Sequence, residues 1–214
     1  MQSMLLQLAE GMATSVAIFV LTLLFSLPLG VLVALARMSK SRLLSGLMRI
    51  YISIMRGTPL MLQLLVVFFG PYYLLRVNLG SGYRFPAVIL AFVINYAAYF
   101  AEIYRGGIAS MPRGQYEAAQ VLGYSRAQTF AHIILPQVVK RVLPSVTNEV
   151  ITLVKDTSLA FVLSVTEMFT IAKAIAAAEK TMIPYLAAGI FYYVFNFVVA
   201  VLMERLEHRL NYYR

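Results

Sequence analysis

Residues 11–36, GMATSVAIFVLTLLFSLPLGVLVALA, form an apolar stretch with no charged side chain between Glu10 and Arg37. Its 26 residues are enough for an α-helix to cross a hydrocarbon core of about 30 Å, which takes roughly 20 residues. The sequence Ala34-Leu35-Ala36 resembles a signal-peptide cleavage site, but the uncharged stretch before it is too long for a signal-peptide core. The stretch therefore predicts a retained first transmembrane helix.

Further apolar windows of similar length follow along the chain. They cover residues 57–75, 85–104, 142–165 and 181–203. The window 142–165 differs from the others because it contains three charged residues, Glu149, Lys155 and Asp156. In a bilayer the backbone must satisfy its own hydrogen bonds, which favours helices. We predict an all-α integral membrane protein in which residues 1–214 form one transmembrane domain of five helices, with a long loop at 105–141.

The composition agrees with a membrane protein and argues against other classes. Hydrophobic residues make up 61% of the chain and charged residues 13%, whereas soluble domains have about 45–50% and about 25%. The net charge of +9 comes from basic residues at the ends of apolar runs, so contact with lipid head groups explains it better than nucleic-acid binding. With no cysteine, the chain has no disulfide and no thiolate metal site.

The distribution of Lys and Arg predicts the orientation of the helices. With five spans and the N-terminus outside, the inner segments hold thirteen basic residues, among them Arg56 and Arg214, and the outer segments hold four. Basic residues concentrate on the cytoplasmic side of membrane proteins. We therefore expect the N-terminus outside and the C-terminus inside. With four spans the basic C-terminal cluster would lie outside.

Polar residues inside the apolar windows have mostly structural interpretations. Thr58-Pro59 predicts a helix start, with the Thr58 hydroxyl as the capping group. Gln63, Asn95 and Asn196 each stand alone among apolar residues, which favours interhelical hydrogen bonds. Glu102 and Arg105 are three residues apart, a spacing typical of an ion pair on a helix surface. His132 and His208 have no neighbouring ligands, so no metal site is predicted.

The loop 105–141 predicts two short helices at a tight turn. Residues 115–122 read as a helix that ends at Gly123, a residue typical of the position just past a helix end. Ser125 and Gln128 match a capping box, which predicts a second short helix before Pro136. We call residues 110–136 the hook. It either docks into a groove of a soluble partner or packs beneath its own helix bundle, and the residues alone favour neither.

A resemblance to a known family rests on the hook. Glu117-Ala118-Ala119, Gly123, Ile133 and Leu135-Pro136 match the EAA loop of ABC importer permeases, E-A-A-x3-G-x9-I-x-L-P, at every fixed position. Residues 56–60 (RGTPL) and 155–159 (KDTSL) look like the permeases of the histidine, arginine, glutamine and cystine uptake systems. The chain thus resembles a type I importer permease over nearly its whole length.

The resemblance implies that this chain works as one subunit of a complex with other chains. The hook would be a coupling helix seated in a groove of the ATPase subunit. The ATPase-coupling residues would be Glu117, Ala118, Ala119, Gly123, Phe130, Ile133, Leu135 and Pro136. Gly123 would let the hook turn tightly, and Glu117 would fix it by pairing with a group in the loop or on the ATPase. The expected direction of transport is import, in a prokaryotic cytoplasmic membrane.

Energy for transport is expected to come from another polypeptide. The sequence contains no G-x-x-x-x-G-K-[ST] phosphate loop. No catalytic residue is therefore assigned to this chain, and ATP and Mg would be bound by the partner ATPase. The complex implied by the resemblance has two ATPase subunits, a second permease chain (identical or a sister) and an extracytoplasmic amino-acid-binding protein.

The window 142–165 carries the candidate substrate path. A polar stripe recurs there at helical spacing, formed by Asn148, Glu149, Thr152, Lys155 and Asp156. Charges inside a span cost about 2.5–3.5 kcal/mol each, so they suggest a function. Glu149 and Lys155 have the signs that an amino-acid zwitterion needs. We favour substrate contact for Asn148 and Glu149. For Lys155 and Asp156 we favour a structural role, because KDTSL looks like a general feature of the family.

An alternative function uses the same stripe. An ion-coupled secondary transporter or channel could take the charged helix as its pathway, and it would transport without an ATPase. A membrane-embedded enzyme has less support, because the sequence shows no histidine cluster and no cysteine. The sequence does not identify the amino acid.

Overall fold

The computed structural model describes residues 2–210, and helices account for nearly all of this range. Arg214 of the basic C-terminal cluster lies outside the described residues. The α-helices are α1 (Gln2–Arg37), α2 (Arg42–Gly57), α3 (Leu60–Leu75), α4 (Arg84–Ala109), α5 (Arg113–Val121), α6 (Arg126–Gln128), α7 (Leu135–Asp156), α8 (Met168–Glu179) and α9 (Ile183–Leu210). Shorter helical segments are the 3-10 turns η1 (Ser81–Tyr83) and η3 (Thr157–Leu163) and the π-helix η2 (Thr129–Ile134).

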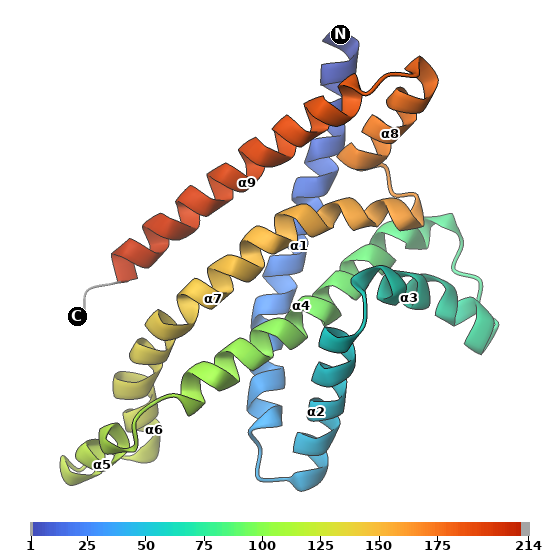
Figure 1. Ribbon diagram of the computed structural model, residues 1–214. Helices are drawn as coiled ribbons and strands as arrows, with labels where there is room; N and C mark the ends of the chain where they lie inside the picture. Colours follow the sequence, from blue (N-terminus) through green and yellow to red (C-terminus); the bar gives the residue numbers. More distant parts are fainter. Residues whose placement is uncertain (1, 211–214) are drawn as a thin grey trace.

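Four long helices, α1, α4, α7 and α9, run between two ends of the molecule. The N-terminus and α8 lie at one end, and the hook with α5 and α6 lies at the other (Figure 1). Helix α1 begins at Gln2, well before the apolar window, because the charged Glu10 is exposed on the helix surface and does not end it. At about 1.5 Å per residue, the 36 residues of α1 extend roughly 54 Å.

The number of membrane crossings depends on how two bent helix pairs are counted. By length and composition, α1, η1 with α4, and α9 can each span a membrane. The pair α2 and α3 is bent by 113°, and the helical segment 126–163 is bent by 59° against α8. Up to five spans result when each bent pair counts as one.

The break between α2 and α3 differs from the sequence prediction. Residues 42–57 form a helix, not only a cytoplasmic connection, and Ile52 packs in a cluster with Val33 of α1 and Ala98 of α4. The capping role predicted for Thr58 was wrong. Helix α3 has Pro59 as its N-cap without a side-chain bond, and the Thr58 hydroxyl donates 2.8 Å back to the Ile54 carbonyl in α2. A residue before proline prefers extended backbone, which ends α2 at this point.

The second helix of the hook also differs from the prediction. It begins at the predicted capping box of Ser125 and Gln128, but it does not end before Pro136. Instead α6, η2 and α7 follow one another without a break as far as Asp156. Proline in a helix clashes with the carbonyl four residues earlier. The wider π turn, in which the Leu135 N–H bonds the Phe130 carbonyl, makes room for Pro136.

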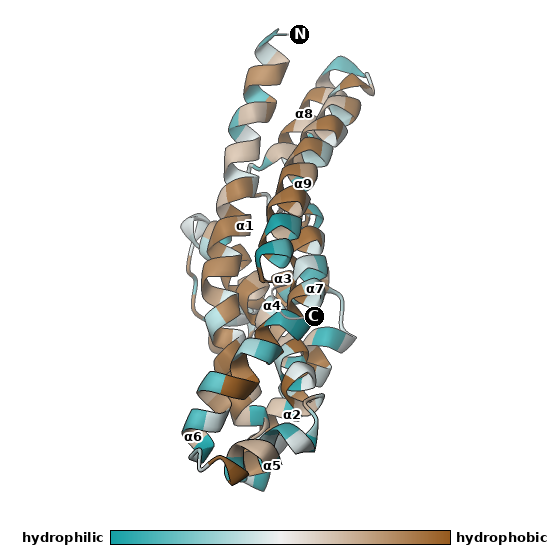
Figure 2. Ribbon diagram, turned by 90° about the vertical axis from the view of Figure 1, so that its left-hand side faces the viewer, coloured by the Kyte–Doolittle hydropathy of each residue, from teal (hydrophilic) through white to brown (hydrophobic). Residues whose placement is uncertain are grey.

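The core lies where α4 passes between α1 and α7. Phe92, Tyr96 and Phe100 of α4 are fully or almost fully buried there. Close approach to α1 requires a glycine, because a Cβ on Gly30 would lie 2.8 Å from Phe100 Cβ. Hydrophobic residues cover long stretches of α1 and α9, whereas hydrophilic residues are frequent around α5 and α6 (Figure 2). On α9, Leu186 is 69% and Ile190 65% exposed, which suits contact with lipid.

Candidate functional site

The polar stripe occupies one helix, α7, but its members have different surroundings. Asp156 is bonded within the chain, since its Oδ2 accepts 2.7 Å from the Tyr96 hydroxyl of α4. The Thr152 hydroxyl donates 2.9 Å to the Asn148 carbonyl of its own helix. Asn148 and Lys155 are exposed, and Glu149 is half-buried. Within residues 2–210 the Glu149 carboxylate has no hydrogen-bond or ion-pair partner, so it remains available to a ligand.

Tyr96 holds Asp156 from a rigid position. Only 2% of Tyr96 is exposed, and its ring is stacked on Phe92 with centroids 6.3 Å apart. A buried tyrosine hydroxyl needs a polar partner, and the Asp156 carboxylate supplies it. This bond ties α4 to the end of α7 and supports the structural role expected for Asp156.

A group of buried amides fixes the break between α2 and α3. Asn95 Nδ2 donates 2.9 Å to Gln63 Oε1 and 3.1 Å to the Met55 carbonyl. Gln63 Nε2 donates 3.0 Å to the same carbonyl and 2.9 Å to the Thr58 hydroxyl. Interhelical hydrogen bonding is thus confirmed for Gln63 and Asn95. For Asn196, the buried Oδ1 has no partner among the described residues.

Arg56 lies in a helix and not in the loop expected from the sequence. It was counted with the cytoplasmic cations, but it lies in the last turn of α2, roughly 21 Å along the helix from Arg42. Its guanidinium carbon lies 5.3 Å from the centre of the Tyr99 ring on α4. The position of Arg56 could have been predicted from the apolar residues that recur between 43 and 55, because they indicate a helix that carries Arg56 away from the loop.

Glu167 is an acidic residue for which no role was predicted from the sequence. Its side chain is fully buried and caps the first turn of α8. The carboxylate accepts from the N–H groups of Phe169 and Thr170, both at 2.7 Å, and from the Thr170 hydroxyl at 2.8 Å. Hydroxyls of α9 and α1 complete the shell, Tyr192 at 3.1 Å and Ser15 at 3.4 Å. A lone acid before an apolar run is the available signal for such a cap.

The tip of the hook has the geometry of a Schellman motif. The N–H of Gly123 bonds the Gln120 carbonyl and the N–H of Tyr124 bonds the Ala119 carbonyl, both at 3.0 Å. Gly123 has a φ of +79°, in the left-handed region. Beside this turn, Val121 is 88% and Leu122 73% exposed. Large apolar side chains at the tip therefore face outward.

The predicted coupling residues divide between two surroundings. Exposed members are Glu117, Ala118, Gly123 and Leu135, whereas Ala119 is buried and Phe130, Ile133 and Pro136 are half-buried. Phe130 and Ile133 pack against the main core of the bundle. The Glu117 carboxylate makes no hydrogen bond or ion pair with any residue in the range 2–210. One side of the hook thus rests on its own bundle and the other is open.

The two ends of the hook are clamped together. Arg141 of α7 donates to Ser110 at the end of α4, 2.7 Å to its carbonyl and 3.1 Å to its hydroxyl. One turn earlier, Gly107 approaches Val142 so closely that a Cβ on Gly107 would lie 2.2 Å from Val142 Cγ1. The predicted ion pair of Glu102 and Arg105 on α4 is confirmed. The hook therefore emerges from two helices that are packed together at its base.

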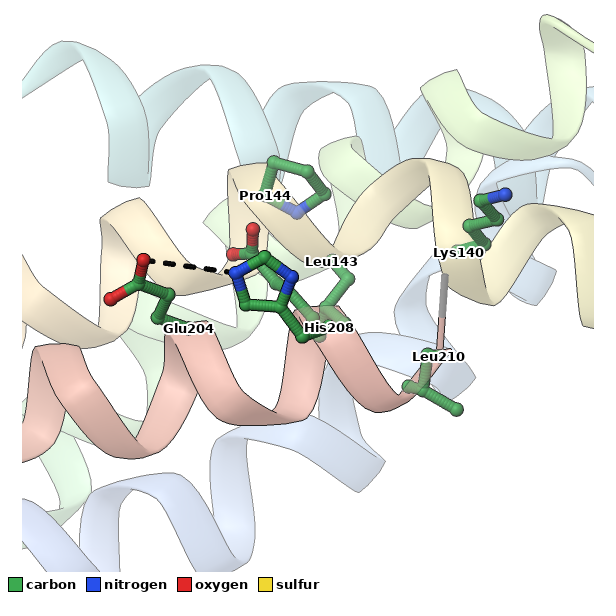
Figure 3. Close-up of a pocket in the computed structure, with 7 residues that line it drawn as sticks. Lys140, Leu143, Pro144, Glu204, His208 and Leu210 are labelled. Atoms are coloured by element: carbon green, nitrogen blue, oxygen red, sulfur yellow. Dashed lines mark ion pairs between the residues drawn. The ribbon is translucent and has the colours of Figure 1, made fainter. Parts of the chain in front are cut away.

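A cavity of about 300 Å³ lies between α7 and α9, near the hook (Figure 3). Its polar lining includes Lys140, Glu204, Glu207 and His208. The Glu207 carboxylate accepts 2.5 Å from the Thr147 hydroxyl, and His208 Nε2 lies 3.8 Å from Glu204 Oε1 at an exposed position. No member of the stripe lines this cavity. Among the described residues, no group of three His, Cys, Asp or Glu side chains could hold a metal ion.

Comparisons with known proteins agree with this geometry. Residues 26–212 match the family model described as binding-protein-dependent transport system inner membrane component. The L-cystine transport system permease protein TcyB of Bacillus subtilis is 35% identical over 96% of this chain and 87% of its own length. The nopaline transport system permease protein NocM of Agrobacterium fabrum is 36% identical over 96% and 88%. A crystal structure described as an amino acid ABC transporter with histidines has a TM-score of 0.86 and 29% identity, covering 95% of this chain and 94% of that one.

Proposed function

The chain belongs to the family of binding-protein-dependent transport system inner membrane components, and from this we infer that it is the permease subunit of an ABC importer for a polar amino acid. It works in the cytoplasmic membrane, and a separate ATPase hydrolyses the ATP. The observation that carries the inference is the hook, in which the EAA pattern coincides with a Schellman turn that exposes Val121 and Leu122.

We propose five membrane spans with the N-terminus outside and the C-terminus inside. In this topology α2 with α3, and the segment 126–163 with α8, are each one broken span beside α1, α4 and α9. The proposal is supported by the basic residues near the hook end of the molecule: Arg113, Arg126, Lys140, Arg141, Arg205 and Arg209. Cationic side chains near the ends of spans favour the cytoplasmic side.

The coupling surface is the open side of the hook. Glu117, Ala118 and Leu135 would contact the ATPase directly, together with Val121 and Leu122. A groove on the ATPase would bury these apolar side chains and offer Glu117 a basic or amide partner. Ala119, Phe130, Ile133 and Pro136 would act from the other side by holding the hook on its bundle, and Gly123 would shape the turn.

The complete importer would contain three further kinds of component. Two copies of the ATPase would bind ATP and Mg, and a second permease chain, identical or a sister, would complete the membrane part. An extracytoplasmic binding protein would deliver the amino acid. The solute would pass along the α7 stripe, where Asn148 and Glu149 are proposed to touch it, Thr152, Lys155 and Asp156 lie beside the path, and Asp156 is anchored to Tyr96.

Reconstitution into proteoliposomes tests this function. The chain would be combined with the ATPase and the binding protein of its importer, and uptake of labelled L-cystine, L-arginine, L-histidine and L-glutamine would be measured. We expect uptake of at least one amino acid only when ATP and both partners are present. Uptake by the chain alone, driven by a proton or sodium gradient, would instead establish an ion-coupled transporter.

A further inference from the structure

A row of aromatic rings follows the last turns of α3 and ends on η1. Phe68 stacks on Tyr83 with ring centroids 6.1 Å apart, and on its other side Phe69 lies at 4.9 Å. Phe69 in turn lies 6.4 Å from Tyr73, and Tyr73 lies 5.2 Å from Tyr72. The five rings form one continuous surface, which we call the aromatic row. The end of α3 that carries it projects beyond the long helices (Figure 1).

A cavity of about 320 Å³ lies beside the aromatic row. All five rings line it, and the turn at residues 77–81 forms another of its walls. Within this turn the N–H of Gly80 donates 3.0 Å to Asn78 Oδ1, at a φ of +69° that favours glycine. Of the described residues, Arg84 is the one charged residue that lines the cavity.

The positive charge of Arg84 is not neutralised by its surroundings. Between positions 57 and 101 the sequence contains two charged residues, Arg76 and Arg84, and no acidic one. Arg84 also forms no ion pair with any residue in the range 2–210. The hydroxyls of three tyrosines in the aromatic row, the Ser81 hydroxyl and the Asn78 amide line the same cavity and can donate hydrogen bonds. The cavity therefore offers a cation and several donors to an anion.

The position of the cavity identifies the kind of anion. Arg84 is the first residue of α4, and the helical segment Ser81–Ala109 is long and apolar enough to cross a membrane. The first residues of a spanning helix lie at the level of the lipid head groups, where tyrosine is enriched. Leu74 and Leu75, which follow the aromatic row on α3, are largely exposed, and such side chains suit contact with acyl chains. A phosphate attached to acyl chains is the chemistry of a phospholipid.

We propose that this cavity binds a phospholipid with a net negative head group. Arg84 holds the phosphate, and the acyl chains lie along Leu74 and Leu75. A guanidinium is suited to this role because its planar donors can bind two phosphate oxygens at once. Basic pockets at the ends of spanning helices bind lipid head groups in this way. The site does not depend on the orientation of the chain, because both leaflets of a membrane contain phospholipid.

Retention of lipid by the purified permease–ATPase complex tests the proposal. The complex would be extracted from vesicles of equal parts phosphatidylglycerol and phosphatidylcholine, and the phospholipid that stays bound would be measured by mass spectrometry. We expect the wild type to retain phosphatidylglycerol in excess, and Arg84→Gln to retain about tenfold less of it. Arg84→Lys should retain an intermediate amount, because an ammonium binds phosphate only as a point charge. The matched control is Arg76→Gln, which removes an exposed cation that does not line the cavity and should change nothing.

The outcomes separate a lipid site from other uses of the same surface. Equal retention by the wild type and Arg84→Gln would overturn the proposal, and so would an equal loss in Arg76→Gln. Displacement of the lipid by millimolar inorganic phosphate would overturn it in favour of a site for a free anion. Weaker affinity of Arg84→Gln for the binding protein, with unchanged lipid retention, would instead establish a protein docking surface.

Assembly of each variant would be checked by size-exclusion chromatography. If Arg84→Gln does not assemble with the ATPase, Arg84→Lys decides the question, because this variant keeps the charge. Unchanged retention of phosphatidylglycerol by Arg84→Lys would then overturn the role of the guanidinium, and reduced retention would support it.

Discussion

The turn at the tip of the hook depends on a single residue without a Cβ. At a φ of +79°, Gly123 occupies a backbone region that costs other residues about 1–2 kcal/mol. The Schellman bonds to Gln120 and Ala119 hold only in this conformation. A side chain at position 123 would therefore alter the surface that we assign to the ATPase without touching the membrane part of the molecule.

We predict that Gly123→Leu abolishes uptake while the chain still inserts into the membrane. The expected cause is a distorted hook that no longer seats in the ATPase. Uptake and ATPase activity in proteoliposomes are the measurements. The matched control is Gly189→Leu in α9, away from the hook, where φ is not positive and the space around a new Cβ is open, so uptake should persist. Undiminished uptake by Gly123→Leu would contradict the coupling role.

A second residue, Glu149, is predicted to act on substrate and not on the fold. Its carboxylate is half-buried and unbonded within the described residues, so Glu149→Gln removes a charge without breaking a contact. We expect the ATPase activity stimulated by loaded binding protein to fall by about tenfold, as for loss of a charge-assisted bond, and basal activity to change little. Glu179→Gln, at an exposed position of α8, is the control. Equal effects on both activities would indicate a structural role.

At the scale of the elements, the base of the hook is set by the contact between α4 and α7. We predict that Gly107→Ala destabilises the protein by about 1–3 kcal/mol, because its Cβ would clash with Val142 and force the helices apart. Loss of helical circular dichroism on heating would measure the effect. Gly106→Ala, where a Cβ meets nothing within 4 Å, should be harmless. Adding Val142→Ala to Gly107→Ala should restore much of the lost stability. If stability is not restored, a clash with Val142 is not the cause.

The elements show which parts of the fold a sequence can predict. Apolar windows located α1, α4 and α9, because a bilayer disfavours charge in the middle of a spanning helix. The same rule did not predict α2. Its basic residues, Arg42, Arg49 and Arg56, were taken to mark a loop, although the residues between them pack on α1 and α4. Pro136 was wrongly taken to mark the end of a helix, because the π turn that accommodates this proline leaves no mark in the residue pattern.

Only part of the candidate site could be predicted from the sequence. The spacing of the EAA pattern identified the hook, and helical periodicity placed the stripe on one face of α7. The partners of these residues could not be predicted, because they come from elements distant in sequence. Tyr96 reaches Asp156 across 60 positions, and Ser15 reaches Glu167 across 152. Local patterns carry no information about such contacts.

At the scale of the whole molecule, the proposed orientation can be tested with single thiols. The chain has no cysteine, so Ser81→Cys and Gln120→Cys each introduce a unique label site at an exposed position. With the N-terminus outside, a membrane-impermeant maleimide should label position 81 in right-side-out vesicles and position 120 only in inside-out vesicles. The reverse pattern would contradict the orientation, and labelling of both positions from one side would contradict five spans.

The unbroken run of helix from Arg126 to Asp156 fixes a rotational phase between the hook and the stripe. Each residue of an α-helix turns the chain by about 100°, so one residue added between Pro136 and Asn148 would rotate Glu149 out of register with the hook. Seven added residues would nearly restore the angle but displace the carboxylate by roughly 10 Å along the helix. The length of this segment thus sets both the direction in which Glu149 points and its height above the hook.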